Sequence, residues 1–322
     1  MNIKGYIDQF TESLSHLGWY DEREIRTMAT YILKEVASIE SYKIIVSPEL
    51  ELGDEISARL QQITAQMATG RPMQYALGYE YFCSHKFNVA EGVLIPRPET
   101  EELVRLVADD AASAAGNGPL KILDICTGSG CIAWSIAAAL PGSKVWGCDI
   151  SEESLKIAQS QNIDGVEPGA VNFFKCDVLA EDALSVISSA VISSAVISSP
   201  VASSAADLSA DLAANLPEND KFDIIISNPP YVCDDEKKLM RPNVLDFEPH
   251  LALFVPDEDP LLFYRRIAEL SAQLLKKGGM LYFETNERFA YTTAARMAGQ
   301  GFKNCRVITD FFEKDRMARG QW

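Results

Sequence analysis

The stretch SNPPY at residues 227–231 directly follows an apolar run typical of a buried strand, and its residue types are an unusual way to end a strand. Two consecutive prolines have no N–H to donate, so the carbonyl groups of Pro229 and Pro230 lie clear of nearby competing donors. Asn228 adds a side-chain carbonyl acceptor, and the following proline favours an extended conformation for it. Tyr231 would form a flat wall. These residues predict a rigid pocket whose acceptors converge on the –NH2 group of a planar amide or an aromatic amine.

A second motif, Cys126-Thr127-Gly128-Ser129-Gly130, follows an earlier apolar run and precedes a helical one. Such a strand–glycine–helix junction lets the backbone approach a ligand closely. Asp149 ends the next predicted strand, where its carboxylate could bind both hydroxyl groups of a ribose. Gly128, Gly130 and Ala133 also satisfy the dinucleotide-binding pattern. The loop alone therefore leaves NAD and other adenosine cofactors open.

Asp177 and Val178 follow a third predicted strand. At that position the carboxylate could accept a hydrogen bond from the amino group of an adenine, and Val178 could pack against the face of the ring. The alternative role of Asp177 is a turn cap. We interpret the pair as part of the same cofactor site.

The composition excludes several classes of protein. Among 322 residues, 46 are acidic and 29 are basic, which gives a net charge of −17. This charge disfavours a protein that binds nucleic acid through its phosphates. The seven cysteines include no CxxC pair and the three histidines no metal-ligand spacing, so we expect reduced thiols and no metal site. Without a signal sequence or a long apolar run, the sequence predicts a cytoplasmic protein that does not associate with membranes. Nothing in it demands more than a monomer.

Periodicity predicts the elements that must position these residues. Residues 1–74 contain three amphipathic helical stretches, which indicate a small helical domain, and residues 75–95 favour a β-hairpin linker. Residues 96–322 then alternate between strands and helices, which predicts an α/β fold with a doubly wound parallel sheet and ligands at the carboxyl ends of its strands. The expected strands are Leu120–Ile125, Lys144–Asp149, Val171–Cys176, Phe222–Ser227, Met280–Thr285 and Cys305–Thr309. The expected helices are Cys131–Leu140, Ser151–Gln161, Leu261–Leu275 and Arg288–Ala298.

Residues 181–219 do not fit this alternation. From Ser188 to Asp207 they form a five-residue repeat rich in serine, a period that matches neither a helix nor a strand. A sheet protein needs only a short connection here. We therefore expect a flexible insertion with no chemical role.

Together the motifs resemble the S-adenosylmethionine-dependent methyltransferases that carry an Asn-Pro-Pro-Tyr signature. More narrowly, the chain resembles the peptide chain release factor N5-glutamine methyltransferase family. Besides the loop at 124–130, Asp149 and Asn228–Tyr231, the resemblance rests on further stretches: Pro72-x-Gln74-Tyr75-x-x-Gly78, Leu94-Ile95-Pro96-Arg97-Pro98-Glu99-Thr100-Glu101, Glu248–Leu253 and Asp315-Arg316-Met317. It is close over residues 70–322 and looser over the N-terminal helices. Two departures are Cys126 and Asn286, which stand where the family usually has glycine.

The resemblance implies methylation of the glutamine side chain in the Gly-Gly-Gln motif of class-1 peptide chain release factors. It implies S-adenosyl-L-methionine as the cofactor, bound by residues 126–130, Asp149, Asp177, Val178 and Asn228. It further implies that Asn228–Tyr231 hold the reacting amide, and that the N-terminal domain helps to grip the protein substrate. A carboxamide nitrogen is a weak nucleophile because its lone pair is delocalised, so fixed acceptors for its N–H groups would orient and activate it.

Other activities share this pocket chemistry. A methyltransferase acting on a glutamine of a ribosomal protein would carry nearly every motif. An amino-methyltransferase of adenine or guanine in nucleic acid would need the same acceptors, but the acidic charge and the Leu94–Glu101 signature disfavour it. An NAD-dependent oxidoreductase would leave Asn228–Tyr231 unused.

Overall fold

The computed structural model describes residues 1–113, 118–197 and 216–322, which form two compact units. Unit 1 comprises Met1–Tyr79 with Leu239–Glu248, and unit 2 comprises Glu80–Lys238 with Pro249–Trp322. The segment 239–248 lies inside the methyltransferase domain that the sequence predicts, yet it packs with the N-terminal helices. Among the described residues, no helix is long and apolar enough to cross a membrane.

Unit 1 is helical, as the sequence predicts. Its helices are α1 (Ile3–Ser15), α2 (Glu22–Ala37), α3 (Ser41–Val46), α4 (Asp54–Met67), α5 (Met73–Leu77) and α11 (Pro242–Phe247). α2 begins with a capping box, because Asp21 and Glu24 each accept a hydrogen bond from the other's backbone N–H. Arg241, which precedes α11, binds Glu24 of α2 at 2.8 Å and so ties α11 to the N-terminal helices of this unit.

The predicted hairpin consists of β1 (Tyr79–Phe82) and β2 (His85–Asn88). Cys83 and Ser84 form its turn with φ angles of 48° and 66°, which suits a tight two-residue hairpin connection. Phe82 and Phe87 are buried against each other, with ring centroids 5.9 Å apart, and belong to the core of unit 2.

The central sheet of unit 2 has seven strands in the order β10-β11-β9-β6-β3-β4-β5. Their bounds are β3 (Lys121–Ile125), β4 (Lys144–Asp149), β5 (Val171–Lys175), β6 (Phe222–Ser227), β9 (Leu275–Glu284), β10 (Lys303–Thr309) and β11 (Asp315–Gln321). The doubly wound α/β fold and the six predicted strands are confirmed. The sheet is mixed rather than parallel, however, because β11, which the sequence analysis missed, pairs antiparallel with both β9 and β10.

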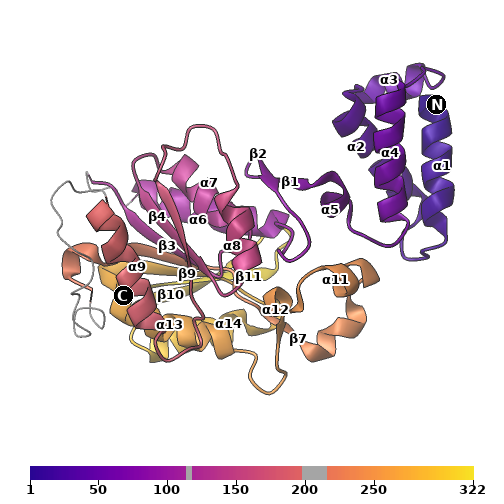
Figure 1. Cartoon of the computed structure of the whole chain (residues 1–322). Coiled ribbons are helices and arrows are strands. Elements are labelled where there is room, and N and C mark those ends of the chain that lie inside the picture. Colours follow the sequence, from indigo (N-terminus) through magenta and orange to yellow (C-terminus); the bar gives the residue numbers. More distant parts are fainter. Residues whose placement is uncertain (114–117, 198–215) are drawn as a thin grey trace. The chain divides into compact units, whose positions relative to one another are not determined.

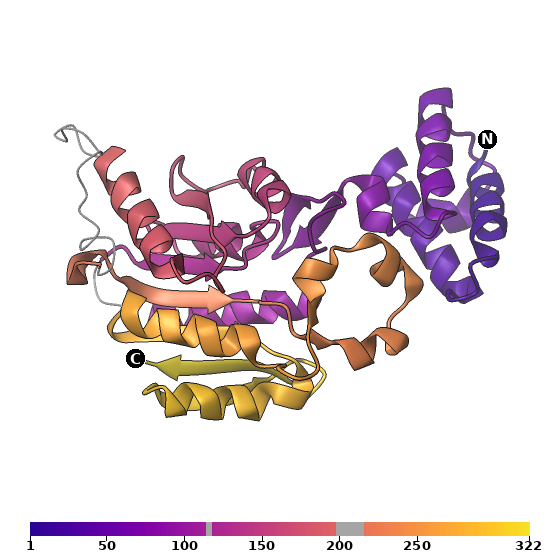
Figure 2. The same cartoon turned by 60° about the horizontal axis from the view of Figure 1, so that its bottom comes forward.

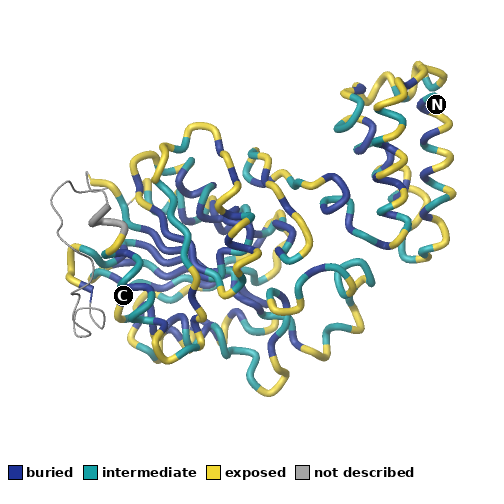
Figure 3. Tube along the Cα trace, viewed as in Figure 1, coloured by how far each residue is buried: buried dark blue, intermediate teal, exposed yellow. Residues whose placement is uncertain are grey.

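Helices cover both faces of this sheet, as Figure 1 shows. On one face lie α6 (Pro98–Ser113), α7 (Cys131–Ala139) and α8 (Glu152–Gln159); on the other lie α9 (Ala183–Ile197), α13 (Leu262–Leu274) and α14 (Ala290–Gly299). Figure 2 brings the face covered by α13 and α14 toward the viewer. Alternate residues of each strand enter the two cores; in β6, for example, Ile224 and Ile226 face one and Ile225 the other. The inner strands β3, β4 and β6 are accordingly buried along most of their length, whereas the edge strands β5 and β10 are more exposed (Figure 3).

Three short elements complete unit 2 near the end of β6. β7 (Val232–Cys233) pairs in parallel with β8 (Phe254–Val255), and α12 (His250–Leu253) precedes β8. Tyr231 donates its backbone N–H to the carbonyl oxygen of Leu253 at 3.2 Å. These pairings hold the chain that follows Asn228 against the segment 250–255.

The expected flexible insertion is wrong for its first part, because residues 183–197 form α9. Ala183, Ile187 and Val191 recur at a spacing of four residues and are fully buried in the core. A sequence with a five-residue repeat can therefore still place apolar residues on one face of a helix. Residues 198–215, which carry the rest of the repeat, lie outside the described residues.

Candidate active site

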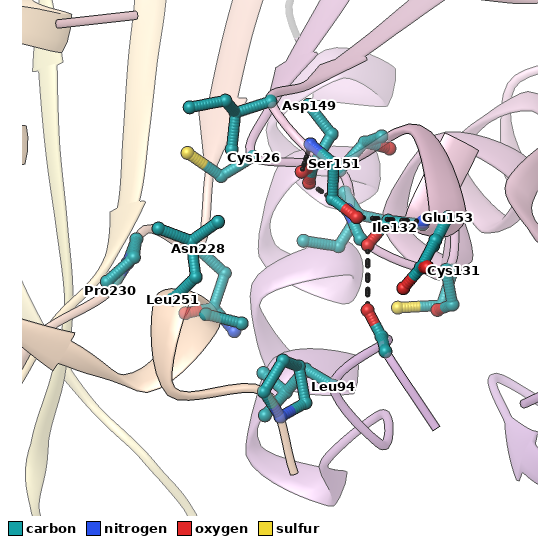
Figure 4. A pocket seen from close by; sticks show the side chains of 18 of the residues that line it. Leu94, Cys126, Cys131, Ile132, Asp149, Ser151, Glu153, Asn228, Pro230 and Leu251 are labelled. Atoms are coloured by element: carbon teal, nitrogen blue, oxygen red, sulfur yellow. Dashed lines mark hydrogen bonds between the residues drawn. The ribbon is translucent and has the colours of Figure 1, made fainter. Parts of the chain in front are cut away.

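Unit 2 contains a cavity of about 360 Å³ at the carboxyl ends of β3, β4, β5 and β6. This is where a doubly wound sheet is expected to bind its ligand. The sequence-predicted residues that line it are Cys126, Thr127, Gly128, Ser129, Asp149, Asp177, Val178, Asn228 and Pro230. Figure 4 shows Asn228, Pro230 and Leu251 on one side of the cavity and Asp149, Ser151 and Glu153 on the other.

The loop after β3 is fixed by hydrogen bonds to the end of β4. Asp149 accepts the backbone N–H of Gly128 on Oδ2 and that of Ser151 on Oδ1, both at 2.9 Å. Thr127 donates its N–H to the carbonyl of Cys148 and its hydroxyl to Asp124, at 3.0 and 2.6 Å. Burial raises the pKa of Asp149, an effect that the backbone donors oppose. The carboxylate is thus held rigidly beside the cavity and keeps lone pairs for further donors.

Gly130 is not among the described residues that line the cavity. It precedes α7 with a φ of 78°, and a Cβ atom there would lie 2.9 Å from the ring of Phe173 and 3.1 Å from Cβ of Ala158. The position therefore requires glycine for its backbone angle and for packing.

Asp177 caps a turn and also faces the cavity. Its Oδ1 accepts the backbone N–H of Leu179 at 2.9 Å, which is a turn cap, and the residue also lines the cavity. Val178, Ile150 and Phe263 provide apolar surface in the same cavity. Apolar side chains together with one carboxylate match the polarity of an adenine ring, which has apolar faces and an amino group that donates hydrogen bonds.

At the opposite side of the cavity, Asn228 is held by residues far away in the sequence. Its Nδ2 donates to the hydroxyl oxygen of Thr100, in α6, at 3.2 Å. Thr100 in turn donates to Oε2 of Glu284, at the end of β9, at 2.6 Å. With its nitrogen engaged in this way, Asn228 leaves its side-chain oxygen for a ligand, the acceptor that the sequence predicts.

Pro229 and Tyr231 are not among the described residues that line the cavity, although their neighbours Asn228 and Pro230 are. The Tyr231 hydroxyl instead donates to Oε1 of Glu284 at 3.0 Å, and burial beside that carboxylate raises the pKa of the phenol. Asn286 braces the same segment, because its Nδ2 donates to the carbonyl of Tyr231 at 3.2 Å and to Glu236 at 2.9 Å.

Thr100 and Glu284 are the functional candidates that sequence reasoning missed. Thr100 lies within the Leu94–Glu101 signature, but nothing in its local sequence indicates a partner 184 residues away. A signal for Glu284 did exist: it is an acid at the carboxyl end of a strand, as Asp149 is. Glu284 is 1% exposed and Thr100 is 3% exposed. Thr100 lines the cavity, whereas Glu284 is not among the described residues that line it.

Comparison with known proteins defines the class. Residues 7–78 match the PrmC N-terminal domain, and residues 122–205 match a methyltransferase domain. The release factor glutamine methyltransferase of Bacteroides thetaiotaomicron is 38% identical over 98% of this chain and 97% of its own length. That of Flavobacterium psychrophilum is 37% identical over 99% of both chains, and that of Leptospira interrogans 30% identical over 90% and 89%. The chain is a methyltransferase, and it belongs to the release factor glutamine methyltransferase family.

The cavity fits S-adenosylmethionine, the methyl donor of this enzyme. Its volume is in the range of small-molecule sites. It offers the Asp149 carboxylate for ribose hydroxyls, and Gly128, where the lack of a side chain lets a ligand approach the backbone. Asp177 and Val178 would hold the adenine, and residues 126–129 would contact the rest of the molecule.

Proposed function

We propose that this chain transfers a methyl group to the side-chain amide nitrogen of the glutamine in the Gly-Gly-Gln motif of class-1 peptide chain release factors. The observation that carries the proposal is Asn228, whose amide nitrogen is bound by Thr100 and whose oxygen is left as an acceptor in the cavity that Asp149 shares. Near-complete coverage of the curated relatives supports the same substrate.

In this mechanism the chain supplies orientation and polar contacts. The Asn228 oxygen accepts one N–H of the glutamine amide, and the backbone carbonyl of Pro229 or Pro230 accepts the other. Two fixed acceptors orient the nitrogen and raise its electron density, and preorganised contacts of this kind are typically worth roughly 10²–10³ in rate. S-adenosylmethionine, when bound, provides an electrophilic methyl group on its sulfonium sulfur.

No side chain needs to act as a dedicated base in this proposal. An amide nitrogen that has gained a methyl group carries a positive charge and is strongly acidic, so one of its two protons leaves readily to water. The acceptors at Asn228 and the Pro229-Pro230 segment hold the two N–H groups of the substrate until that proton leaves. A release factor substrate supports a cytoplasmic location for the reaction.

Transfer of a labelled methyl group from S-adenosylmethionine to recombinant release factors tests the function. The matched control is the same factor with alanine in place of the motif glutamine. Label on the normal factor and none on the control, with the modified peptide identified by mass spectrometry, is the expected result. Ribosomal protein and DNA are assayed in parallel, and label only on one of them would refute the proposed substrate.

A further inference from the structure

A buried chain of hydrogen bonds runs from Glu284 through Thr100 to Asn228. We propose that Glu284 and Thr100 are positioning residues, which fix the orientation of the Asn228 amide so that its oxygen, not its nitrogen, faces the cavity. The inference rests on the proposed function for its catalytic consequence, because only the oxygen can accept a hydrogen bond from a substrate amide.

The direction of each hydrogen bond follows from the chemistry of the carboxylate. An ionised carboxylate accepts hydrogen bonds and donates none. Both oxygens of Glu284 are engaged by hydroxyl groups, Oε2 by Thr100 at 2.6 Å and Oε1 by Tyr231 at 3.0 Å. The single proton of the Thr100 hydroxyl is therefore committed to Glu284.

A hydroxyl whose proton is committed can only accept from its remaining neighbours. The group of Asn228 that lies 3.2 Å from Thr100 Oγ1 must then be the –NH2 group, because a carbonyl oxygen there would face a lone pair. This places Oδ1 of Asn228 on the side of the cavity. The carboxylate of Glu284 thus determines, through one intervening hydroxyl, which end of a distant amide meets the substrate.

Burial strengthens this relay, the chain of hydrogen bonds from Glu284 through Thr100 to Asn228. Thr100 and Glu284 are almost completely buried, so water does not compete for their hydrogen bonds. A reversed Asn228 amide would leave polar atoms unpaired in a site of low dielectric, which is costly.

Protonation of Glu284 would undo the relay. A neutral carboxyl group can donate to Thr100 Oγ1, which frees the threonine proton to bind Asn228 Oδ1 and permits the amide to reverse. Burial raises the pKa of Glu284, while its hydrogen bonds with Thr100 and Tyr231 and the charge of Arg316 on β11 oppose the shift. Glu99 of α6 raises the pKa further, and the phenol of Tyr264 on α13 also faces the group. The methylation rate should therefore fall on the acid side as Glu284 takes up a proton.

Thr100→Val tests the relay, because it keeps the shape of the side chain and removes the hydroxyl. We expect kcat to fall by a factor of about 100, as for the loss of a preorganised polar contact. KM for the release factor and the affinity for S-adenosylmethionine should change little. Thr100→Ser restores the hydroxyl and should restore most of the lost rate. The matched control is Thr293→Val in α14, where a fully buried threonine has no hydrogen-bond partner for its hydroxyl among the described residues.

A second variant and a substrate-free measurement keep the test decisive. Glu284→Gln can donate to Thr100, so it should lower kcat and remove the acid limb of the pH profile even if Thr100→Val does not fold. NMR hydrogen exchange of the Asn228 side-chain amide in the free enzyme should be slow in the wild type and in Thr100→Ser, and fast in Thr100→Val.

The outcomes separate the two proposals. If the wild type does not methylate release factors, the proposed function fails, and the amide exchange still decides the relay. If the wild type is active but Thr100→Val matches the Thr293→Val control in kcat and in amide exchange, the relay is refuted. A Glu284→Gln enzyme with normal kcat and an unchanged acid limb would refute it as well.

Discussion

The two sides of the cavity are built in different ways. On the side predicted to bind the cofactor, Asp149 is held by backbone N–H groups of Ser151, two residues along the chain, and of Gly128, in the loop that follows the adjacent strand β3. On the substrate side, Asn228 depends on the side chains of Thr100 and Glu284, which come from α6 and β9. A site made from backbone depends on the conformation of the loop, whereas a site made from side chains depends on each residue type.

This difference assigns different measurable quantities to the two sides. Changes near Asp149 should alter the affinity for S-adenosylmethionine, because those groups would contact a molecule that is held equally before and during the reaction. Changes near Asn228 should alter kcat, because orientation of the amide matters most in the transition state. Four substitutions test the distinction.

Asn228→Ala should have the largest effect, because it removes the substrate acceptor itself. We expect kcat to fall by a factor of about 10²–10³, the typical cost of losing one preorganised polar contact. The affinity for S-adenosylmethionine, measured by calorimetry, should stay close to that of the wild type. Retained turnover would show that Asn228 does not hold the reacting amide, and a parallel collapse of cofactor affinity would show that the two sides are not separable.

Asp149→Ala should weaken S-adenosylmethionine binding by a factor of roughly 10–100, since hydrogen bonds to a charged group contribute about 1.5–3 kcal/mol. Circular dichroism and thermal unfolding check that the variant is folded. The rate at saturating cofactor should fall much less than the affinity. Unchanged binding would refute the predicted contact with the ribose.

The same difference explains which residues of the site can be predicted from the sequence. The loop at 126–130, Asp149 and Asn228 are recognisable because local rules govern them: glycine where φ is positive, an acid at a strand end, proline where no donor is wanted. The Thr100–Glu284 contact joins residues 184 apart, and no local rule specifies which side chains meet once the sheet has formed. The hydrogen bond from the Tyr231 hydroxyl to the same distant carboxylate is likewise not specified by any local rule.

The fold shows the same division. Strands β3, β4 and β6 are apolar runs between clear breaks, and the sequence predicts them nearly to the residue. β11 reads DRMARGQ, whose charged residues hide a strand in which Met317, Ala318 and Gly320 are buried. Position 320 requires a small residue, because a Cβ atom on Gly320 would lie 2.9 Å from Met297 Cε, 3.0 Å from Cys305 Sγ and 3.2 Å from Phe302 Cβ. Only the tertiary neighbours reveal that requirement.

Tyr231→Phe sharpens the comparison on the substrate side. It removes one hydroxyl from Glu284 but leaves the bond through Thr100 to Asn228, so kcat should fall far less than in Asn228→Ala. The free energy of unfolding should drop by about 1.5–3 kcal/mol, the contribution of a hydrogen bond to a charged group. Denaturant unfolding and steady-state kinetics measure the two effects. A loss of rate as large as that of Asn228→Ala would mean that the phenol has a direct part in the reaction.

Cys126→Gly should have the smallest effect, although the residue lines the cavity. Cys126 has a φ of 63°, a conformation that costs a residue other than glycine about 1–3 kcal/mol. Glycine would relieve that cost, but the unfolded chain would gain entropy and the packing of the thiol would be lost. The free energy of unfolding should therefore change little, and so should the affinity for S-adenosylmethionine, because the backbone rather than the thiol shapes the loop. Cys126→Val, which is branched at Cβ and poorly suited to this angle, should be strongly destabilised by contrast. A Cys126→Gly protein that is stable yet binds the cofactor much more weakly would show that a side chain also contributes on this side.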